Sequence, residues 1–297
     1  MQKLFSSVPK REYAVHNINL SFGHVPFSST SQNGTNFGVT IIDGRSASGK
    51  STILRLLAGL DSPAEGRLFI NGNEVKVEDA PRRDIPSWMK VGSSFASSSI
   101  QTGGLVQPVI IEGKPDFVSS KTVLERMYHM GRDAVQHNFK KQDLEGKYDD
   151  ERDRLLQKLA LEFAKLLQLT EEQYSGSPSD LSPSGQFLFG IACACMVSVA
   201  PSVTVLDLND STNIQSISLP CPILLFDELF DSEHSTTLDK CKAGITNLIQ
   251  SGGVVVSVTH RPLYFMNMAS RRITMSGGKV LADIKIDNVE NQSKTRN

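Results

Sequence analysis

The sequence of 297 residues contains no apolar run long enough to cross a bilayer. Its most apolar stretch covers only residues 187–200, whereas a membrane-spanning helix needs about 20 predominantly apolar residues. A run of this length is typical of a buried core helix, and we predict one there. The first eleven residues contain Lys3, Lys10 and Arg11 without an apolar core, so they do not resemble a secretory signal.

Cysteines are also few, and the net charge is close to zero. Four cysteines in so long a chain exclude a disulfide scaffold. Cys193 and Cys195 have no second His or Cys pair at zinc spacing, so we interpret them as small buried apolar residues. The 31 Lys and Arg balance 32 Asp and Glu, which gives no support for a general nucleic-acid or anionic-membrane surface. The composition is otherwise that of an ordinary globular protein.

The sequence does contain a complete phosphate-binding pattern. Residues 44–52 read GRSASGKST and match G-x-x-x-x-G-K-[ST] at every required position. Residues 37–42 before it predict a strand, and residues 52–60 after it predict an amphipathic helix. Glycines let a backbone wrap around phosphate oxygens, and N–H groups at a helix N-terminus attract them. We therefore predict that a nucleotide is bound by Gly44, Arg45, Ser46, Ala47, Ser48, Gly49, Lys50, Ser51 and Thr52. Lys50 should reach the β- and γ-phosphates, and the Ser51 hydroxyl should bind Mg²⁺.

Two later apolar runs end in side chains suited to phosphate chemistry. Residues 223–226 read ILLF, which is typical of a parallel strand buried on both faces, and Asp227 and Glu228 follow. Since ligands in such sheets bind beyond the carboxyl ends of strands, we predict that Asp227 holds Mg²⁺ and that Glu228 is the general base. Residues 254–258 form a second buried run shortly before His260, which we expect to contact the γ-phosphate or the attacking water.

These patterns together resemble the ATP-binding cassette (ABC) family of ATPases. The resemblance extends from the P-loop through the following helix and hairpin, over residues 44–75. It also includes the Walker B segment at residues 223–228, the switch-histidine strand at residues 254–260 and the closing hairpin at residues 271–284. It implies an α/β fold, with a P-loop NTPase (RecA-like) core, an N-terminal antiparallel β portion and an inserted α-helical subdomain. In this single ABC-type domain, residues 1–117 and 201–297 form the core and residues 118–200 the helical subdomain. Phe22 resembles the family's aromatic residue that stacks on adenine.

The signature of that family, LSGGQ, is altered in this chain. Residues 181–185 read LSPSG before an apolar helix. One alignment puts Pro183 and Ser184 in place of both glycines, and a one-residue shift instead matches Gly185-Gln186 to the final Gly-Gln. The resemblance implies that Ser182, Ser184 and Gly185 close on a nucleotide held by a second subunit. Because Pro183 removes a backbone donor, we expect the signature to be weakened.

Three other segments depart from the family pattern. Either Ala96 or Glu112 occupies the position of the family's glutamine-loop residue, and the sequence does not choose between them. His234 stands where the family has an aspartate in the loop after Walker B, a loop involved in communication between the two sites of a dimer. Residues 93–108 and 204–222 have the polar or Ser- and Gly-rich composition of inserted loops.

The resemblance implies an ATPase that uses ATP and Mg²⁺ and forms a homodimer or heterodimer around two nucleotides. It further implies a separate integral membrane transport subunit and a location in the cytoplasm or at the inner face of a membrane, with an organelle also open; no nucleic acid is expected. Two alternatives remain at this point. One is a soluble ABC ATPase with a non-transport role, and the other is a low-activity regulatory subunit with a degenerate signature.

Overall fold

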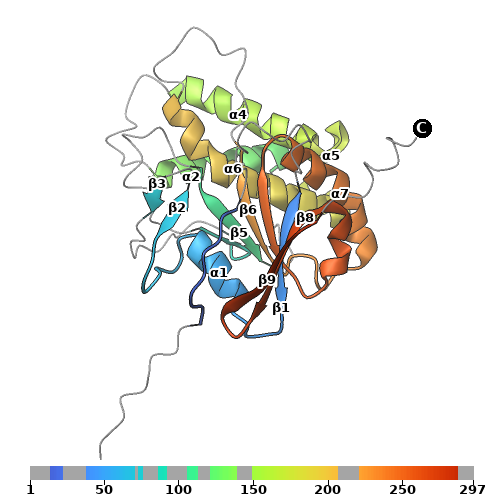
Figure 1. The fold of residues 1–297 in the computed structure, drawn as a ribbon. Coiled ribbons are helices and arrows are strands. Elements are labelled where there is room, and N and C mark those ends of the chain that lie inside the picture. The colour runs from blue at the N-terminus through green and yellow to red at the C-terminus, as the bar shows by residue number, and fades with distance from the viewer. Residues whose placement is uncertain are drawn as a thin grey trace, which may run out of the picture.

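A mixed β-sheet forms the centre of the protein (Figure 1). The computed structural model describes residues 14–22, 38–70, 73–75, 86–91, 106–112, 121–138, 149–206 and 221–286. In this part of the chain, seven strands lie in the order β4-β5-β6-β7-β1-β8-β9. They are β1 (Val39–Gly44), β4 (Met89–Lys90), β5 (Pro108–Glu112), β6 (Ile223–Asp227), β7 (Val254–Val258), β8 (Ala269–Ser276) and β9 (Lys279–Lys285). The five central strands are parallel, and β4 and β9 join the edges in antiparallel pairing.

The central strands form because their apolar residues can be buried on both faces of the sheet. Along β6, Leu224 and Phe226 belong to one hydrophobic cluster and Leu225 to the other. β1 alternates in the same way, with Ile41 on the first face and Ile42 on the second. Helices therefore have to cover both sides, as expected for a parallel sheet.

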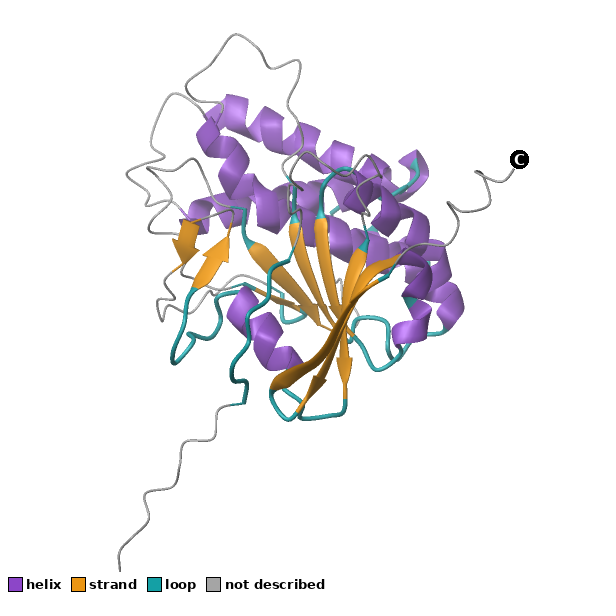
Figure 2. Ribbon diagram, viewed as in Figure 1, coloured by secondary structure: helices purple, strands orange, loops and turns teal. Residues whose placement is uncertain are grey.

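The helices are distributed unequally over the two faces (Figure 2). The face that bears Leu225 and Ile42 is covered by α1 (Lys50–Leu57), which contributes Ile53 and Leu54. The opposite face carries the larger cluster, formed with α2 (Val123–Asn138), α4 (Asp149–Leu166), α6 (Pro183–Leu206) and α7 (Ser235–Gln250). The short helix α5 (Glu171–Ser175) begins with a capping box between Thr170 and Gln173. A separate two-stranded antiparallel ribbon is formed by β2 (Leu68–Ile70) and β3 (Asn73–Val75).

The predicted core helix around residues 187–200 is confirmed, but it is longer than predicted. α6 starts at Pro183, because the polar residues before Phe187 form its first turn, and it continues to Leu206. Its window Pro183–Ala200 is long and apolar enough to cross a membrane by length and composition, which corrects the prediction that no segment would be. That window is 89% buried inside the protein, so α6 has the packing of a core helix. Cys193 and Cys195 are completely buried within it, as predicted.

The α/β class predicted from the sequence is confirmed, and several boundaries move. The predicted end of the helical subdomain at residue 200 falls inside α6, because the helix runs on without a break. Of the predicted loop at residues 93–108, residues 93–105 lie outside the described residues, Val106 and Gln107 are buried, and Pro108 begins β5. Most of the predicted loop at residues 204–222 lies outside the described residues, as does Ala96.

Candidate functional site

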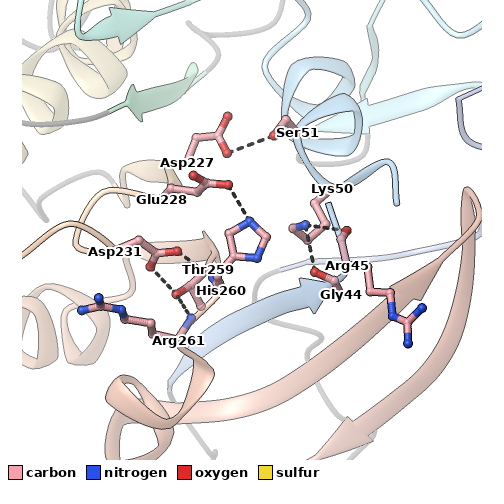
Figure 3. Close-up of polar contacts among 10 residues, drawn as sticks. All are labelled: Gly44, Arg45, Lys50, Ser51, Asp227, Glu228, Asp231, Thr259, His260 and Arg261. Atoms are coloured by element: carbon pink, nitrogen blue, oxygen red, sulfur yellow. Dashed lines mark hydrogen bonds and ion pairs between the residues drawn. The ribbon is translucent and has the colours of Figure 1, made fainter. Parts of the chain in front are cut away.

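The strand order gathers the predicted site residues at one edge of the sheet. β6, β7 and β1 are neighbours in that order, so their carboxyl ends lie side by side. Backbone hydrogen bonds continue beyond the strands, because Thr259 N–H donates to the carbonyl of Ile42 and Glu228 N–H to the carbonyl of Val258. Figure 3 shows the resulting group, in which Lys50 and Ser51 face Asp227, Glu228 and His260.

The P-loop connects β1 to α1 through a backbone that needs glycine at both ends. Gly44 has φ +142°, and a Cβ there would lie 2.3 Å from the carbonyl oxygen of Met275. Gly49 has φ +98°, and a Cβ there would lie 2.6 Å from Val15 Cγ1. Ala47 also has a positive φ, of 60°, which costs a non-glycine residue about 1–2 kcal/mol. The loop is therefore held in a strained, close-packed form suited to exposing N–H groups.

Lys50 occupies the centre of this loop. Its side chain is buried, and Nζ donates to the carbonyl oxygens of Gly44 and Arg45, each at 3.0 Å. Burying an ammonium group is costly unless it has partners, so a counter-charge in the loop would be stabilised strongly. Among the predicted P-loop residues, Ser48 is buried and Arg45, Ser46, Ala47 and Ser51 are exposed.

Ser51 and Asp227 supply the two oxygen groups expected of a magnesium site. The hydroxyl of Ser51 donates to Asp227 Oδ1 at 3.2 Å, which joins the first turn of α1 to the end of β6. Burial raises the pKa of Asp227, the hydrogen bond from Ser51 opposes this, and the neighbouring Glu228 adds to it. A hydroxyl and a carboxylate beside a phosphate loop fit the ligands that Mg²⁺ prefers.

Glu228 and His260 form a second pair beside the first. Nε2 of His260 lies 3.0 Å from Glu228 Oε1, and both side chains are about half exposed. Glu228 has φ +54°, a left-handed conformation that turns its side chain away from the path of β6. The carboxylate is thus accessible to water and fixed in direction by an imidazole, which is the arrangement a general base requires.

The altered signature lies at the start of α6. Ser182 and Pro183 are exposed, whereas Ser184 and Gly185 are buried. Ser182 Oγ accepts from the N–H of Gly185 at 3.2 Å and so caps the helix. The carbonyl of Ser184 accepts from Cys241 Sγ of α7. Of the three predicted signature residues, only Ser182 therefore presents its side chain to the surface.

Phe22 lies against Arg271 of β8. Its ring is half-buried under the guanidinium group of Arg271, 5.7 Å from the ring centre. Arg271 is in register with Thr40, four residues or roughly 13 Å before Gly44 along β1. Ala14 and Val15 of the same N-terminal segment adjoin the P-loop, because a Cβ on Gly49 would meet both.

Glu112, one of the two residues considered for the glutamine position, ends β5 opposite Asp227 of β6. Its carboxylate forms an ion pair with Lys90 of β4. The structure thus brings Glu112 to the same sheet edge as the predicted magnesium ligand. Asp231 and Thr259 also lie at this edge, although neither is among the site residues predicted from the sequence.

The chain is similar to several known proteins. Residues 31–207 match the family model described as "ABC transporter". The chain is 26% identical over 269 residues to the energy-coupling factor transporter ATP-binding protein EcfA2 of Ligilactobacillus salivarius, an alignment covering 90% of this chain and 75% of that protein. It is 35% identical over 123 residues to the methionine import ATP-binding protein MetN of Rhodopseudomonas palustris, covering 40% of this chain and 30% of that protein.

The fold is also similar to a solved structure. The ATP-binding cassette MJ0796, a dimer in a post-hydrolysis state with ADP and Pi, aligns with a TM-score of 0.52 and 21% identity. The alignment covers 95% of each chain. At this level of identity the likeness supports the fold alone.

Proposed function

The chain belongs to the ABC transporter family, and from this premise we propose that it is the ATP-binding and ATP-hydrolysing subunit of a transporter. The observation that carries the proposal is the convergence of three groups at one sheet edge. These are the P-loop with Lys50, the Ser51–Asp227 pair, and the Glu228–His260 pair. A phosphate cradle, a metal-ligand pair and a residue that orients or deprotonates water are recurring parts of the sites that transfer a phosphoryl group to water.

Each group has a separate task in ATP hydrolysis. The P-loop N–H groups and Lys50 bind the phosphates, and this charge stabilisation is commonly the largest contribution to the rate. Ser51 and Asp227 would hold Mg²⁺, which when bound neutralises charge on the β- and γ-phosphate oxygens. Glu228 accepts the proton of the attacking water, and His260 fixes the carboxylate while contacting the water or the γ-phosphate.

The second subunit completes the site in this proposal. Ser182 and the N-terminus of α6 form the surface that closes on a γ-phosphate held by the partner's P-loop, since a long helix N-terminus attracts anions. Pro183 contributes no N–H there, so this contact is weaker than an all-donor signature would give. The dimer works with separate membrane subunits at the cytoplasmic face of a membrane. The helical subdomain, whose last helix α6 continues past residue 200 to Leu206, carries the signature towards the partner.

The test is the mass in solution of the Glu228→Gln variant, by light scattering with and without Mg·ATP. A dimer that forms only with Mg·ATP is expected if two copies enclose nucleotide. A monomer that still binds ATP would show that the sandwich requires a different second subunit. A variant that binds no ATP would contradict the proposal. The double variant Lys50→Ala/Glu228→Gln is the control, and it should stay monomeric.

A further inference from the structure

The loop after β7 is attached to the turn after β6 by a carboxylate that the proposed chemistry does not use. Asp231 Oδ1 accepts from Thr259 Oγ1 at 2.5 Å, and Asp231 Oδ2 accepts from the backbone N–H of His260 at 2.6 Å. Hydrogen bonds to an ionised carboxylate are short and about twice as strong as neutral ones. Each oxygen of Asp231 therefore holds one of two consecutive residues, as Figure 3 shows.

Thr259 gives this contact a rigid base. Its side chain is completely buried, and its N–H donates to Ile42 of β1. Its hydroxyl donates to Asp231 and also accepts from the N–H of Arg261 at 2.9 Å. Because both the N–H and the hydroxyl of Thr259 are engaged, the carboxylate of Asp231 is anchored to the sheet itself and not to a free loop.

Asp231 and Glu228 come from one tight turn, and both contact His260, one at its backbone and the other at its imidazole. The turn is closed by the N–H of Asp231, which donates to the carbonyl of Glu228 at 3.0 Å. Asp231 holds the backbone of His260, and Glu228 contacts its imidazole. A second link supports this geometry, since Arg261 Nη1 donates to the carbonyl of Glu233 at 3.2 Å.

We propose that Asp231 is a positioning residue, which fixes the backbone of His260 so that the imidazole stays in line with Glu228. Glu228, Asp231, Thr259 and His260 are called the histidine clamp below. The inference deepens the proposed function, because it rests on Glu228 and His260 acting together in hydrolysis. Its consequence is that the general base and the histidine move as one unit when the turn after β6 moves. Misplacing a catalytic group by about 1 Å can cost a hundredfold in rate.

The direct test of the histidine clamp uses ¹⁵N-histidine-labelled full-length protein, in which six histidines give six backbone amide signals. A His260→Gln variant assigns the signal of His260. In Asp231→Asn, the side-chain NH₂ group can no longer accept from one of the two donors. We expect the His260 amide to exchange with solvent about 10–100-fold faster, and the imidazole ¹⁵N shifts of His260 to change. Asp239→Asn removes an exposed carboxylate from α7 and serves as the matched control.

Steady-state hydrolysis gives the second measurement. The kcat of Asp231→Asn should fall about 10–100-fold, while the Kd for ATP changes less than about twofold, because the P-loop is untouched. Asp231→Glu keeps the acceptor charge and should recover part of the loss; it also replaces Asp231→Asn if that variant does not fold.

Two results would overturn the inference. One is His260 amide exchange as slow in Asp231→Asn as in Asp239→Asn, and the other is faster exchange with kcat unchanged. A wild-type chain that binds no ATP would instead contradict the proposed function. In that case the exchange rate and the imidazole shifts still decide on the histidine clamp, because neither measurement needs nucleotide.

Discussion

Nε2 of His260 lies 3.0 Å from Oε1 of Glu228, although the two residues follow different strands and all of α7 separates them in the sequence. The contact exists because β6 and β7 are adjacent and parallel, so both chains leave the sheet at the same edge. In this contact the carboxylate of Glu228 can accept a proton, and the imidazole of His260 can orient that carboxylate. The predictions below follow from this edge and from the helices behind it.

Removing the cationic centre of the P-loop should abolish tight ATP binding. In Lys50→Ala, the phosphates lose a charge-assisted partner worth about 1.5–3 kcal/mol, so the Kd for ATP should rise at least about tenfold. Titration calorimetry measures this directly. Lys165→Ala, on the exposed side of α4, removes the same charge at a remote position and should bind as wild type. Unchanged affinity in Lys50→Ala would refute the assignment of the phosphate cradle.

Neutralising the general base should separate binding from turnover. We expect Glu228→Gln to bind ATP with nearly unchanged affinity and to hydrolyse it about 10²–10⁴-fold more slowly, because the amide cannot accept the water's proton. Phosphate release under saturating ATP is the measurement. Glu233→Gln is a matched control from the same turn, since its contact with Arg261 uses the backbone carbonyl. Normal turnover in Glu228→Gln would show that the base is another group.

Asp227 should lower the stability of the nucleotide-free fold near neutral pH. Burial raises its pKa, so the folded chain binds this proton more tightly than the unfolded chain does. The protonated carboxyl of Asp227 therefore stabilises the folded chain fully below the ordinary pKa of 3.8. This stabilisation is lost as the pH rises through the raised pKa that Asp227 has in the folded chain.

At pH 7 without Mg²⁺, Asp227→Asn should accordingly raise the unfolding temperature, since the amide oxygen can still accept from Ser51. The same change should weaken Mg²⁺-dependent ATP binding. Differential scanning calorimetry of Asp227→Asn beside Asp239→Asn tests the first effect. A lower unfolding temperature specific to Asp227→Asn would contradict the argument.

The two signature serines should differ in their effect on dimer formation. Ser182 is exposed at the start of α6 and Ser184 is buried, so only Ser182 can contact a partner's nucleotide directly. In the Glu228→Gln background, Ser182→Ala should weaken or abolish the ATP-dependent dimer and cost about 0.5–2 kcal/mol of stability as a lost helix cap. Ser184→Ala should leave the dimer intact in the same light-scattering assay. The reverse result would favour the shifted alignment of the signature.

Ser198 should be a critical link between α6 and the sheet. Its buried hydroxyl donates to the carbonyl of Gln107 at 2.6 Å and accepts from the N–H of Ile223 at 3.1 Å. Ser198→Ala deprives two backbone groups of this partner and should cost about 1–3 kcal/mol in urea unfolding. The control is Ser202→Ala, which loses only a bond to Val199 in the same helix and should cost less. Equal costs would show that the link between α6 and the sheet adds nothing to the free energy of unfolding.

Local chemistry explains why so much of the site could be predicted from the sequence. The P-loop is a continuous run whose glycines and lysine act within one turn. The spacing of Gly44, Gly49 and Lys50 is therefore enough to predict a phosphate-binding loop. The runs before Asp227 and His260 are mostly apolar because both faces of those strands are buried, and this pattern predicts buried strands.

The tertiary structure alone decided which side chains meet and which are covered. Phe22 has a suitable spacing before the P-loop, but only the fold places its ring under the guanidinium group of Arg271. Ser184 could not be recognised as buried until α7 was packed beside it. Asp231 has no pattern in the sequence, because its role depends on a second strand that brings Thr259 and His260 within hydrogen-bonding distance. Sequence thus determined the groups that act within one segment, and the fold determined the contacts between segments, since those depend on strand order and on the packing of side chains.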